Sequence, residues 1–147
     1  MRIIYRISDV GYNKVKPDYI NNENCLANAT KEFDDSIWSV IADIQKYVTR
    51  NCILYAEKGN GAATFNMALD EALTYDDEEI IYFIENDYVH KPGSQKILEE
   101  GFKLGASFVA LYDHPDKYIT PEDGGNPYCQ GGASSKAILK VAAPFPF

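Results

Sequence analysis

Two carboxylates separated by one residue, Glu85 and Asp87, follow the apolar run Ile80–Ile84. A short continuous apolar run of this kind is typical of a strand buried on both faces. Side chains alternate along a strand, so positions 85 and 87 are predicted to project to the same side. Two such carboxylates, together with substrate phosphates, suit Mg²⁺ or Mn²⁺. The alternative is an acid pair in a β-turn, because so short a motif is weak evidence by itself.

Polar residues also follow the other apolar runs of the chain. They are Ser8-Asp9, Asp43, Glu57-Lys58-Gly59-Asn60-Gly61 and Asp113-His114. Parallel strands bring their carboxyl ends to one edge of a sheet, and ligands of open α/β sheets bind outside that edge. We therefore expect these residues, together with Glu85, Asn86 and Asp87, to surround a binding site. The alternative is a set of ordinary solvated loops, which buried strands also require.

The glycine-containing loop Gly59–Gly61 leads into an amphipathic segment. Glycines let backbone amides approach a phosphate, and a helix N-terminus adds a positive end. The loop is not a Walker motif, because no Gly-Lys-Ser/Thr follows, and it lacks the third glycine of a dinucleotide fingerprint. Because of its glycines and the helix that follows, we still predict that Asn60, Gly61 and Asn66 contact a phosphate. Asp70 lies one turn beyond Asn66. The alternative is a plain loop and helix cap.

The elements that must position these residues alternate between two periodicities. Five apolar runs of five or six residues are predicted strands: Ile3–Ile7, Ile37–Ala42, Cys52–Ala56, Ile80–Ile84 and Ser107–Tyr112. Helical spacing of apolar residues is clearest at 65–73, is present between Pro92 and a C-terminal stop at Gly105, and is weaker at 22–33. Alternating strands and helices predict an α/β fold with a mostly parallel central sheet between two helical layers.

The charge of the chain narrows the classes of partner. Lys and Arg number 14 against 22 acidic residues, a net charge of −8. An acidic chain without a basic cluster does not fit a nucleic-acid binder. No apolar run has the length of a membrane span and the start of the chain lacks an export signal, so we expect a cytoplasmic protein. Three widely spaced cysteines argue against a disulfide framework or a zinc finger.

The last part of the chain differs in composition from the rest. All 22 acidic residues lie in 1–123, which is predicted to be one α/β domain, whereas 124–147 hold two lysines and no acid. Glycines and prolines predict a loop-rich tail over 124–147. Such a tail is either an ordinary frayed terminus or the point where a longer domain has been cut short.

These residues resemble the family-2-like glycosyltransferases, which have the glycosyltransferase A-type fold. The opening strand is similar to the one whose end, here Ser8-Asp9, cradles the nucleotide. Asp43 resembles the aspartate that reads the nucleotide base. The segment from Asn60 to Asn66 resembles a loop and helix ending in an Arg-Asn pair, although Phe65 stands in the arginine position. Glu85-Asn86-Asp87 resembles the metal-binding D-x-D motif, with Glu in the first position.

The resemblance implies a protein that binds a nucleotide-diphosphate sugar through Mn²⁺ or Mg²⁺. Asp87, with Glu85, would hold the ion, which would contact the diphosphate and neutralise the leaving group. The match extends from Arg2 to about Tyr118, the nucleotide-binding half of such an enzyme. The family's acceptor site and catalytic base lie in a second half that has no counterpart in this chain, so a complete enzyme would transfer the sugar and this chain is expected to bind the donor without turnover.

Three further expectations come from the same pattern. A receiver-like phospho-signalling domain is the alternative from another class, with Ser8-Asp9, Glu57 and Lys117 in imperfect positions for its site. A non-catalytic nucleotide-binding remnant is the other alternative. A sheet that lacks its second half leaves an open edge and an uncovered apolar face, so we expect the chain to form a homodimer.

Overall fold

The computed structural model describes residues 1–10, 15–43, 45–47, 52–54 and 59–111. The chain divides into two compact units, Met1–His90 and Lys91–Phe147. The division falls inside the domain predicted over 1–123, and the tail predicted over 124–147 lies outside the described residues. The predicted site residues before His90 all belong to the first unit.

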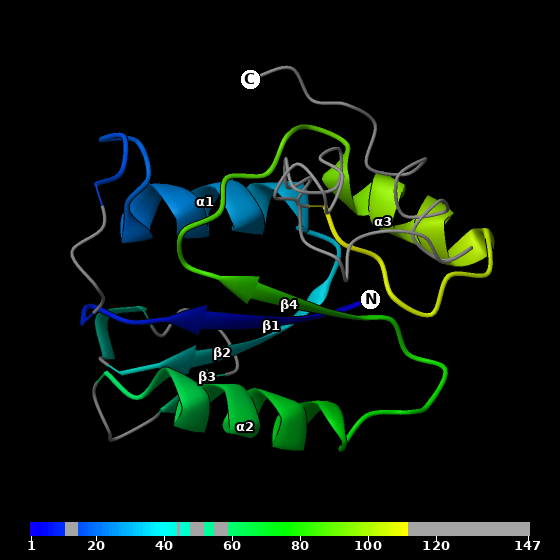
Figure 1. Ribbon diagram of the computed structural model, residues 1–147, viewed down its shortest axis with the longest axis horizontal. Coiled ribbons are helices and arrows are strands. Elements are labelled where there is room, and N and C mark those ends of the chain that lie inside the picture. The colour runs from blue at the N-terminus through cyan, green and yellow to red at the C-terminus, as the bar shows by residue number, and fades with distance from the viewer. Residues whose placement is uncertain (11–14, 44, 48–51, 55–58, 112–147) are drawn as a thin grey trace, which may run out of the picture. The chain divides into compact units, whose positions relative to one another are not determined.

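Four parallel strands form the sheet of the first unit (Figure 1). They are β1 (Arg2–Ile7), β2 (Ile37–Ala42), β3 (Cys52–Leu54) and β4 (Ile81–Glu85). Their order across the sheet is β3-β2-β1-β4, so β1 lies between β2 and β4. Tyr5 of β1 is in register with Val40 on one side and with Ile84 on the other. The predicted parallel sheet is confirmed for these four strands.

Helices α1 (Asn22–Glu32) and α2 (Gly61–Ala72) cover opposite faces of this sheet (Figure 1). The chain moves one way across the sheet from β1 to β2 and the other way from β3 to β4. Right-handed crossovers in opposite directions place their helices on opposite faces. The predicted three layers are thus present in the first unit, and the short 3-10 helix η1 (Gln45–Tyr47) follows β2.

The core fills both sides of the sheet. On the α2 side, Ile4, Ile41 and Ala68 are buried and Met67, Ala72, Tyr75 and Ile81 pack against them. On the α1 side, Tyr5 and Phe33 are fully buried and pack against other aromatic rings. The ring centroids of Tyr5 and Trp38 lie 5.9 Å apart, and those of Phe33 and Tyr82 lie 5.3 Å apart. Alternate residues of β1 therefore serve different layers, which leaves Arg2, Ile4 and Arg6 on the α2 side.

The second unit contains α3 (Ser94–Lys103). Gly93 at its start and Gly105 just beyond its end have φ angles of 87° and 82°, in the left-handed region that glycine adopts without strain. The helix predicted between Pro92 and Gly105 is confirmed, with Gly105 as its stop. None of the described helices is long and apolar enough to cross a membrane.

Two of the predicted strands differ from the structure. The run Ser107–Tyr112 is not a strand over 107–111, and Phe108 is 82% exposed there. An apolar, β-branched composition favours a strand only where a neighbouring strand pairs with it, and none of the described strands lies in the second unit. The run Cys52–Ala56 is a strand over Cys52–Leu54, and its last two residues lie outside the described part.

Candidate functional site

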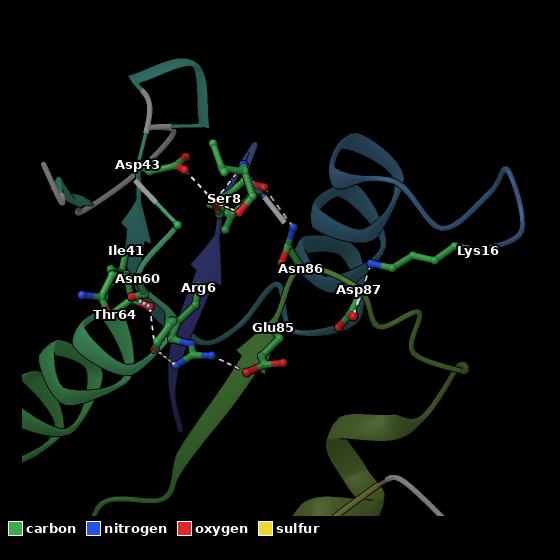
Figure 2. A pocket seen from close by; sticks show the side chains of 14 residues that line it. Arg6, Ser8, Lys16, Ile41, Asp43, Asn60, Thr64, Glu85, Asn86 and Asp87 are labelled. Atoms are coloured by element: carbon green, nitrogen blue, oxygen red, sulfur yellow. Dashed lines mark hydrogen bonds and ion pairs between the residues drawn. The ribbon is translucent and has the colours of Figure 1, made fainter. Parts of the chain in front are cut away.

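A pocket of about 480 Å³ opens at the carboxyl ends of the strands and is named here the strand-end pocket. It is lined by Arg6, Ile7, Ser8, Val10, Lys16, Ile41, Asp43, Gly59, Asn60, Gly61, Thr64, Glu85, Asn86 and Asp87 (Figure 2). The chain reverses its direction across the sheet between β1 and β4, so their carboxyl ends flank a topological switch point. Open α/β sheets bind ligands at such a point.

Asp43 follows the last residue of β2 and is held on both carboxylate oxygens. The Ser8 hydroxyl donates a hydrogen bond to Oδ2 at 2.5 Å, and the Asp9 backbone N–H donates to Oδ1 at 3.1 Å. Asp43 therefore has a fixed position at the wall of the strand-end pocket, and further lone pairs of its oxygens are available to a ligand.

The side chain of Asp9 points away from the strand-end pocket. Its Oδ1 accepts hydrogen bonds from the Tyr47 hydroxyl and, at 3.1 Å, from Asn22 Nδ2, while Lys46 Nζ lies 3.6 Å from Oδ2. The Tyr47 hydrogen bond is the largest cause that lowers the pKa of Asp9 below its usual value, with those from Asn22 and Lys46 adding to it against the effect of burial. Asp9 thus anchors the loop after β1 and contacts Asp43 through its backbone.

Asn22 and Asn86 join three elements behind the pocket. Asn22 Nδ2 donates to the backbone carbonyl of Ser8 at 2.9 Å, and Asn86 Nδ2 donates to the same carbonyl at 3.3 Å and to Asn22 Oδ1. These bonds tie the start of α1 to the residues that follow β1 and β4. Asn86 is a predicted site residue, whereas Asn22 is not among the predicted ones.

The N-terminus of α2 forms another wall of the pocket. Asn60 caps the helix by accepting a hydrogen bond from the Ala63 N–H at 2.9 Å, and Gly61 and Thr64 also line the pocket. The structure therefore brings Asn60 and Gly61 to the predicted place. Asn66 is exposed and is not among the lining residues; Thr64, two residues earlier, is the one that reaches the pocket.

Glu85 and Asp87 both line the pocket but do not project to the same side. Glu85 is the register partner of Arg6 on the α2 face and forms an ion pair with it. Asp87 Oδ2 lies 3.3 Å from Lys16 Nζ (Figure 2). The chain turns at residues 86 and 87, directly after β4, so the alternation that predicted a common side ends there.

The charge of Asp87 acts on groups of the α1 layer. Burial is the main cause that raises the pKa of the Tyr5 hydroxyl and of the Cys25 thiol, and the negative charge of Asp87 raises both further. Cys25 itself is buried. Glu85 thus lies on the α2 side of the pocket, and Asp87 lies near its α1 side.

The donor set suits a divalent ion of the kind that also binds phosphates. Mg²⁺ is held in proteins by one or two carboxylates plus substrate phosphates, not by an all-protein cage. Glu85 and Asp87 provide two carboxylates at one pocket, and within the described ranges no cluster of three or more His, Cys, Asp or Glu side chains forms a closed metal site. Two carboxylates at one pocket are the protein ligands that such a shared ion requires.

Sequence reasoning missed the polar lining residues Arg6, Lys16 and Thr64 and the supporting residue Asn22. Arg6 carried a signal, because a basic residue inside an otherwise buried strand needs a partner. Lys16 lies in a polar stretch without periodicity, and Asn22 is a polar residue at the start of the weak helical pattern over 22–33, so nothing distinguished either one from a solvated residue.

Comparison of the chain with protein-family models, with curated proteins and with solved structures gives no match. The inference of function therefore depends on the strand-end pocket and on the residues that line it.

Proposed function

We propose that the first unit, Met1–His90, binds a nucleoside diphosphate at the strand-end pocket, as the donor-binding half of a glycosyltransferase-like protein. The observation that carries this proposal is the convergence of four strand-end or loop segments on one pocket at the β1–β4 switch point. Nucleotide ligands of open α/β sheets occupy this position. The glycosyltransferase A-type fold and the sugar are the finer parts of the proposal and derive from the motif resemblance.

Phosphate binding is supported by positive groups inside an acidic chain. The net charge of −8 repels an anion in general, so a phosphate site needs local compensation. Arg6 and Lys16 line the pocket, and the N-terminal end of α2 directs backbone amides and a positive dipole end to it. A diphosphate contacting these groups would be held by charge-assisted hydrogen bonds.

Asp87 and Glu85 would hold Mn²⁺ or Mg²⁺ in the liganded protein. The bound ion would supply Lewis-acid stabilisation of the diphosphate as a leaving group. Asp43 would accept a hydrogen bond from the nucleotide base, because Ser8 and the Asp9 N–H already fix its carboxylate. Ser8 and Asp9 therefore act as positioning residues for Asp43 in this proposal.

The strand order argues against the receiver-like alternative. Receiver domains belong to the flavodoxin-like order 2-1-3-4-5, in which β3 pairs with β1. Here β3 pairs with β2, and β4 takes the other side of β1. The order 3-2-1-4 is instead the first part of a doubly wound nucleotide-binding sheet. The non-catalytic nucleotide-binding remnant remains the second candidate, because it shares the same pocket.

Calorimetry of UDP and GDP binding, with and without Mn²⁺, tests the proposal. We expect Mn²⁺ to raise the affinity of the preferred nucleotide by about tenfold or more, since charged hydrogen bonds and ion contacts contribute ~1.5–3 kcal/mol each. Asp87→Ala should remove most of this increase. Asp70→Ala is the matched control, because Asp70 is exposed on α2 outside the pocket lining.

Equal nucleotide affinity with and without metal would contradict the metal-dependent proposal. Loss of the metal effect in Asp70→Ala as well as in Asp87→Ala would remove the assignment to the strand-end pocket. Incubation with UDP-sugars then separates the two candidates: release or transfer of the sugar identifies an enzyme, and stable binding without turnover identifies the remnant.

A further inference from the structure

Arg6 is held in the strand-end pocket from three directions. Its guanidinium forms an ion pair with Glu85, donates a 3.4 Å hydrogen bond from Nη1 to the Gly61 carbonyl, and lies 5.2 Å from the centre of the Phe65 ring. The side chain is only 17% exposed. The Gly61 carbonyl and the Phe65 ring both belong to α2, so this helix holds the guanidinium independently of Glu85.

Glu85 is the less constrained member of this pair. Its side chain is 53% exposed at the end of β4, and the chain turns away directly after it. Arginine keeps its charge at every physiological pH, so a guanidinium buried to this degree needs an anion beside it. The carboxylate of Glu85 supplies that anion.

We propose that Glu85 is an exchangeable counterion, which leaves Arg6 when a diphosphate takes its place and a divalent ion receives the carboxylate. This inference rests on the proposed function and adds a coupling between metal and nucleotide. A phosphate offers the guanidinium the same planar, two-point hydrogen bonding as a carboxylate. Glu85 released in this way is a metal ligand instead of an unpaired charge.

The exchange makes the binding of the two ligands reciprocal. A metal ion that draws Glu85 away exposes the Arg6 guanidinium to the phosphate, and a phosphate on Arg6 frees Glu85 for the metal. Thermodynamic linkage requires that each ligand raise the affinity of the other by the same factor. A site in which Arg6 and Glu85 had separate roles would not show this dependence on their pairing.

Two substitutions should shift the two ligands in opposite directions. In Arg6→Gln, the affinity for UDP should fall by about tenfold or more, while the affinity for Mn²⁺ alone should rise, because Glu85 no longer has a competing cation. In Glu85→Gln, pyrophosphate should bind more tightly than to the parent in the absence of metal, while Mn²⁺ should bind more weakly. Calorimetry with each probe alone measures these four changes.

Arg2→Gln is the matched control for Arg6→Gln. Arg2 lies on the same strand and face, 4.5 Å from the centre of the Tyr75 ring, and its Nε lies 3.4 Å from Glu79. It is at the opposite end of β1 and does not line the pocket. Its substitution should leave the affinities for UDP, pyrophosphate and Mn²⁺ unchanged.

The outcomes separate this inference from the proposed function. If Arg6→Gln weakens both ligands, or Glu85→Gln fails to strengthen metal-free pyrophosphate binding, the exchange is wrong even though UDP binds with Mn²⁺. If the parent shows no gain in UDP affinity from Mn²⁺, the proposed function fails. Tighter pyrophosphate binding in Glu85→Gln would then still support the counterion role. Glu85 is half exposed, so its variant tests the exchange even where Arg6→Gln does not fold.

Discussion

Arg2 and Arg6 occupy the two ends of β1 on the same face of the sheet, and each lies over an aromatic ring and beside a glutamate. At the amino end, Glu79 is shared between Arg2 and the N-terminal amino group, which lies 3.6 Å away. The ring below Arg2 belongs to Tyr75, whose hydroxyl is 2.7 Å from the Ser39 hydroxyl and also contacts Glu71. The groups of this cluster contact one another, although the buried Arg2 Nε makes only an ion pair with Glu79 and no hydrogen bond.

At the carboxyl end the same arrangement faces a pocket. Arg6 and Glu85 line about 480 Å³ of open volume together with Lys16 and Asp87. The difference follows from sheet polarity, because the strand order reverses between β1 and β4, and ligands of open α/β sheets bind outside the carboxyl ends of the strands at such a point. A cation, a ring and a carboxylate thus form a structural clamp at one end and a candidate ligand site at the other.

The largest expected effect comes from the residue between the two arginines. Ile4 is fully buried under α2, and Ile4→Ala should lower the free energy of unfolding by about 2–5 kcal/mol through lost burial and a cavity. Urea denaturation measures this loss. Ile4→Val, which removes one methyl group, should cost about 0.5–1.5 kcal/mol. An Ile4→Ala variant as stable as the parent would contradict the shared core beneath both ends.

Acid should destabilise the first unit through His90, its last residue. This histidine is buried in the segment after β4. Its backbone N–H donates a hydrogen bond to Asn28 Oδ1 and its carbonyl accepts one from Asn28 Nδ2, while its Nε2 lies 2.9 Å from the Tyr82 hydroxyl. Burial lowers the pKa of His90 from 6.5 to about 4, so the folded state binds the proton less well than the unfolded chain. Its stabilising contribution is complete above pH 6.5 and is lost progressively as pH falls to about 4, by up to about 3 kcal/mol.

The variant His90→Gln isolates this effect. Its free energy of unfolding should depend less on pH between 6.5 and 4 than that of the parent, whatever its stability at neutral pH. Parallel pH profiles for parent and variant would show that His90 does not titrate with folding. His114 is the only other histidine of the chain and lies outside the described residues, so its own variant is the control.

Asp43→Ala should affect both binding and folding. Without the structure, a loop carboxylate after a strand is expected to contribute at most about 0.5 kcal/mol to stability. Its two hydrogen bonds from Ser8 and the Asp9 N–H raise the expected loss to about 1–3 kcal/mol, since the Asp9 N–H loses its acceptor and the Ser8 hydroxyl keeps only the Val10 carbonyl. UDP affinity should fall about tenfold or more if Asp43 accepts from the base. Unchanged UDP binding in a folded variant would exclude that role.

The parts of this molecule that follow local patterns could be predicted from the sequence. Helix α2 and strand β4 follow the apolar patterns of their sequences. Asp43 and Glu85 line the pocket because each lies at the carboxyl end of a strand in one parallel sheet. The strand prediction is wrong for residues 107–111, because an apolar run favours a strand only when a neighbouring strand pairs with it.

The directions of the site side chains depend on distant partners. Asp9 turns away from the pocket because Tyr47, from η1, supplies a hydrogen bond to it. Glu85 and Asp87 separate because Arg6 and Lys16 approach them from different elements. Arg6 and Glu85 are 79 positions apart in the sequence, so no local spacing indicates their pairing.

The smallest expected effect compares the two ion pairs directly. Double-mutant cycles should give a coupling energy of about 0.2–1 kcal/mol for Arg2 with Glu79 and for Arg6 with Glu85, because partly exposed pairs gain little in water. Pyrophosphate should leave the coupling of Arg2 with Glu79 unchanged, since that pair lies away from the pocket. It should reduce the coupling of Arg6 with Glu85 to about zero, because the phosphate replaces the carboxylate on the guanidinium. Urea unfolding of the four variants of each cycle, with and without pyrophosphate, measures the difference, and equal responses at the two ends would show that they do not differ in function.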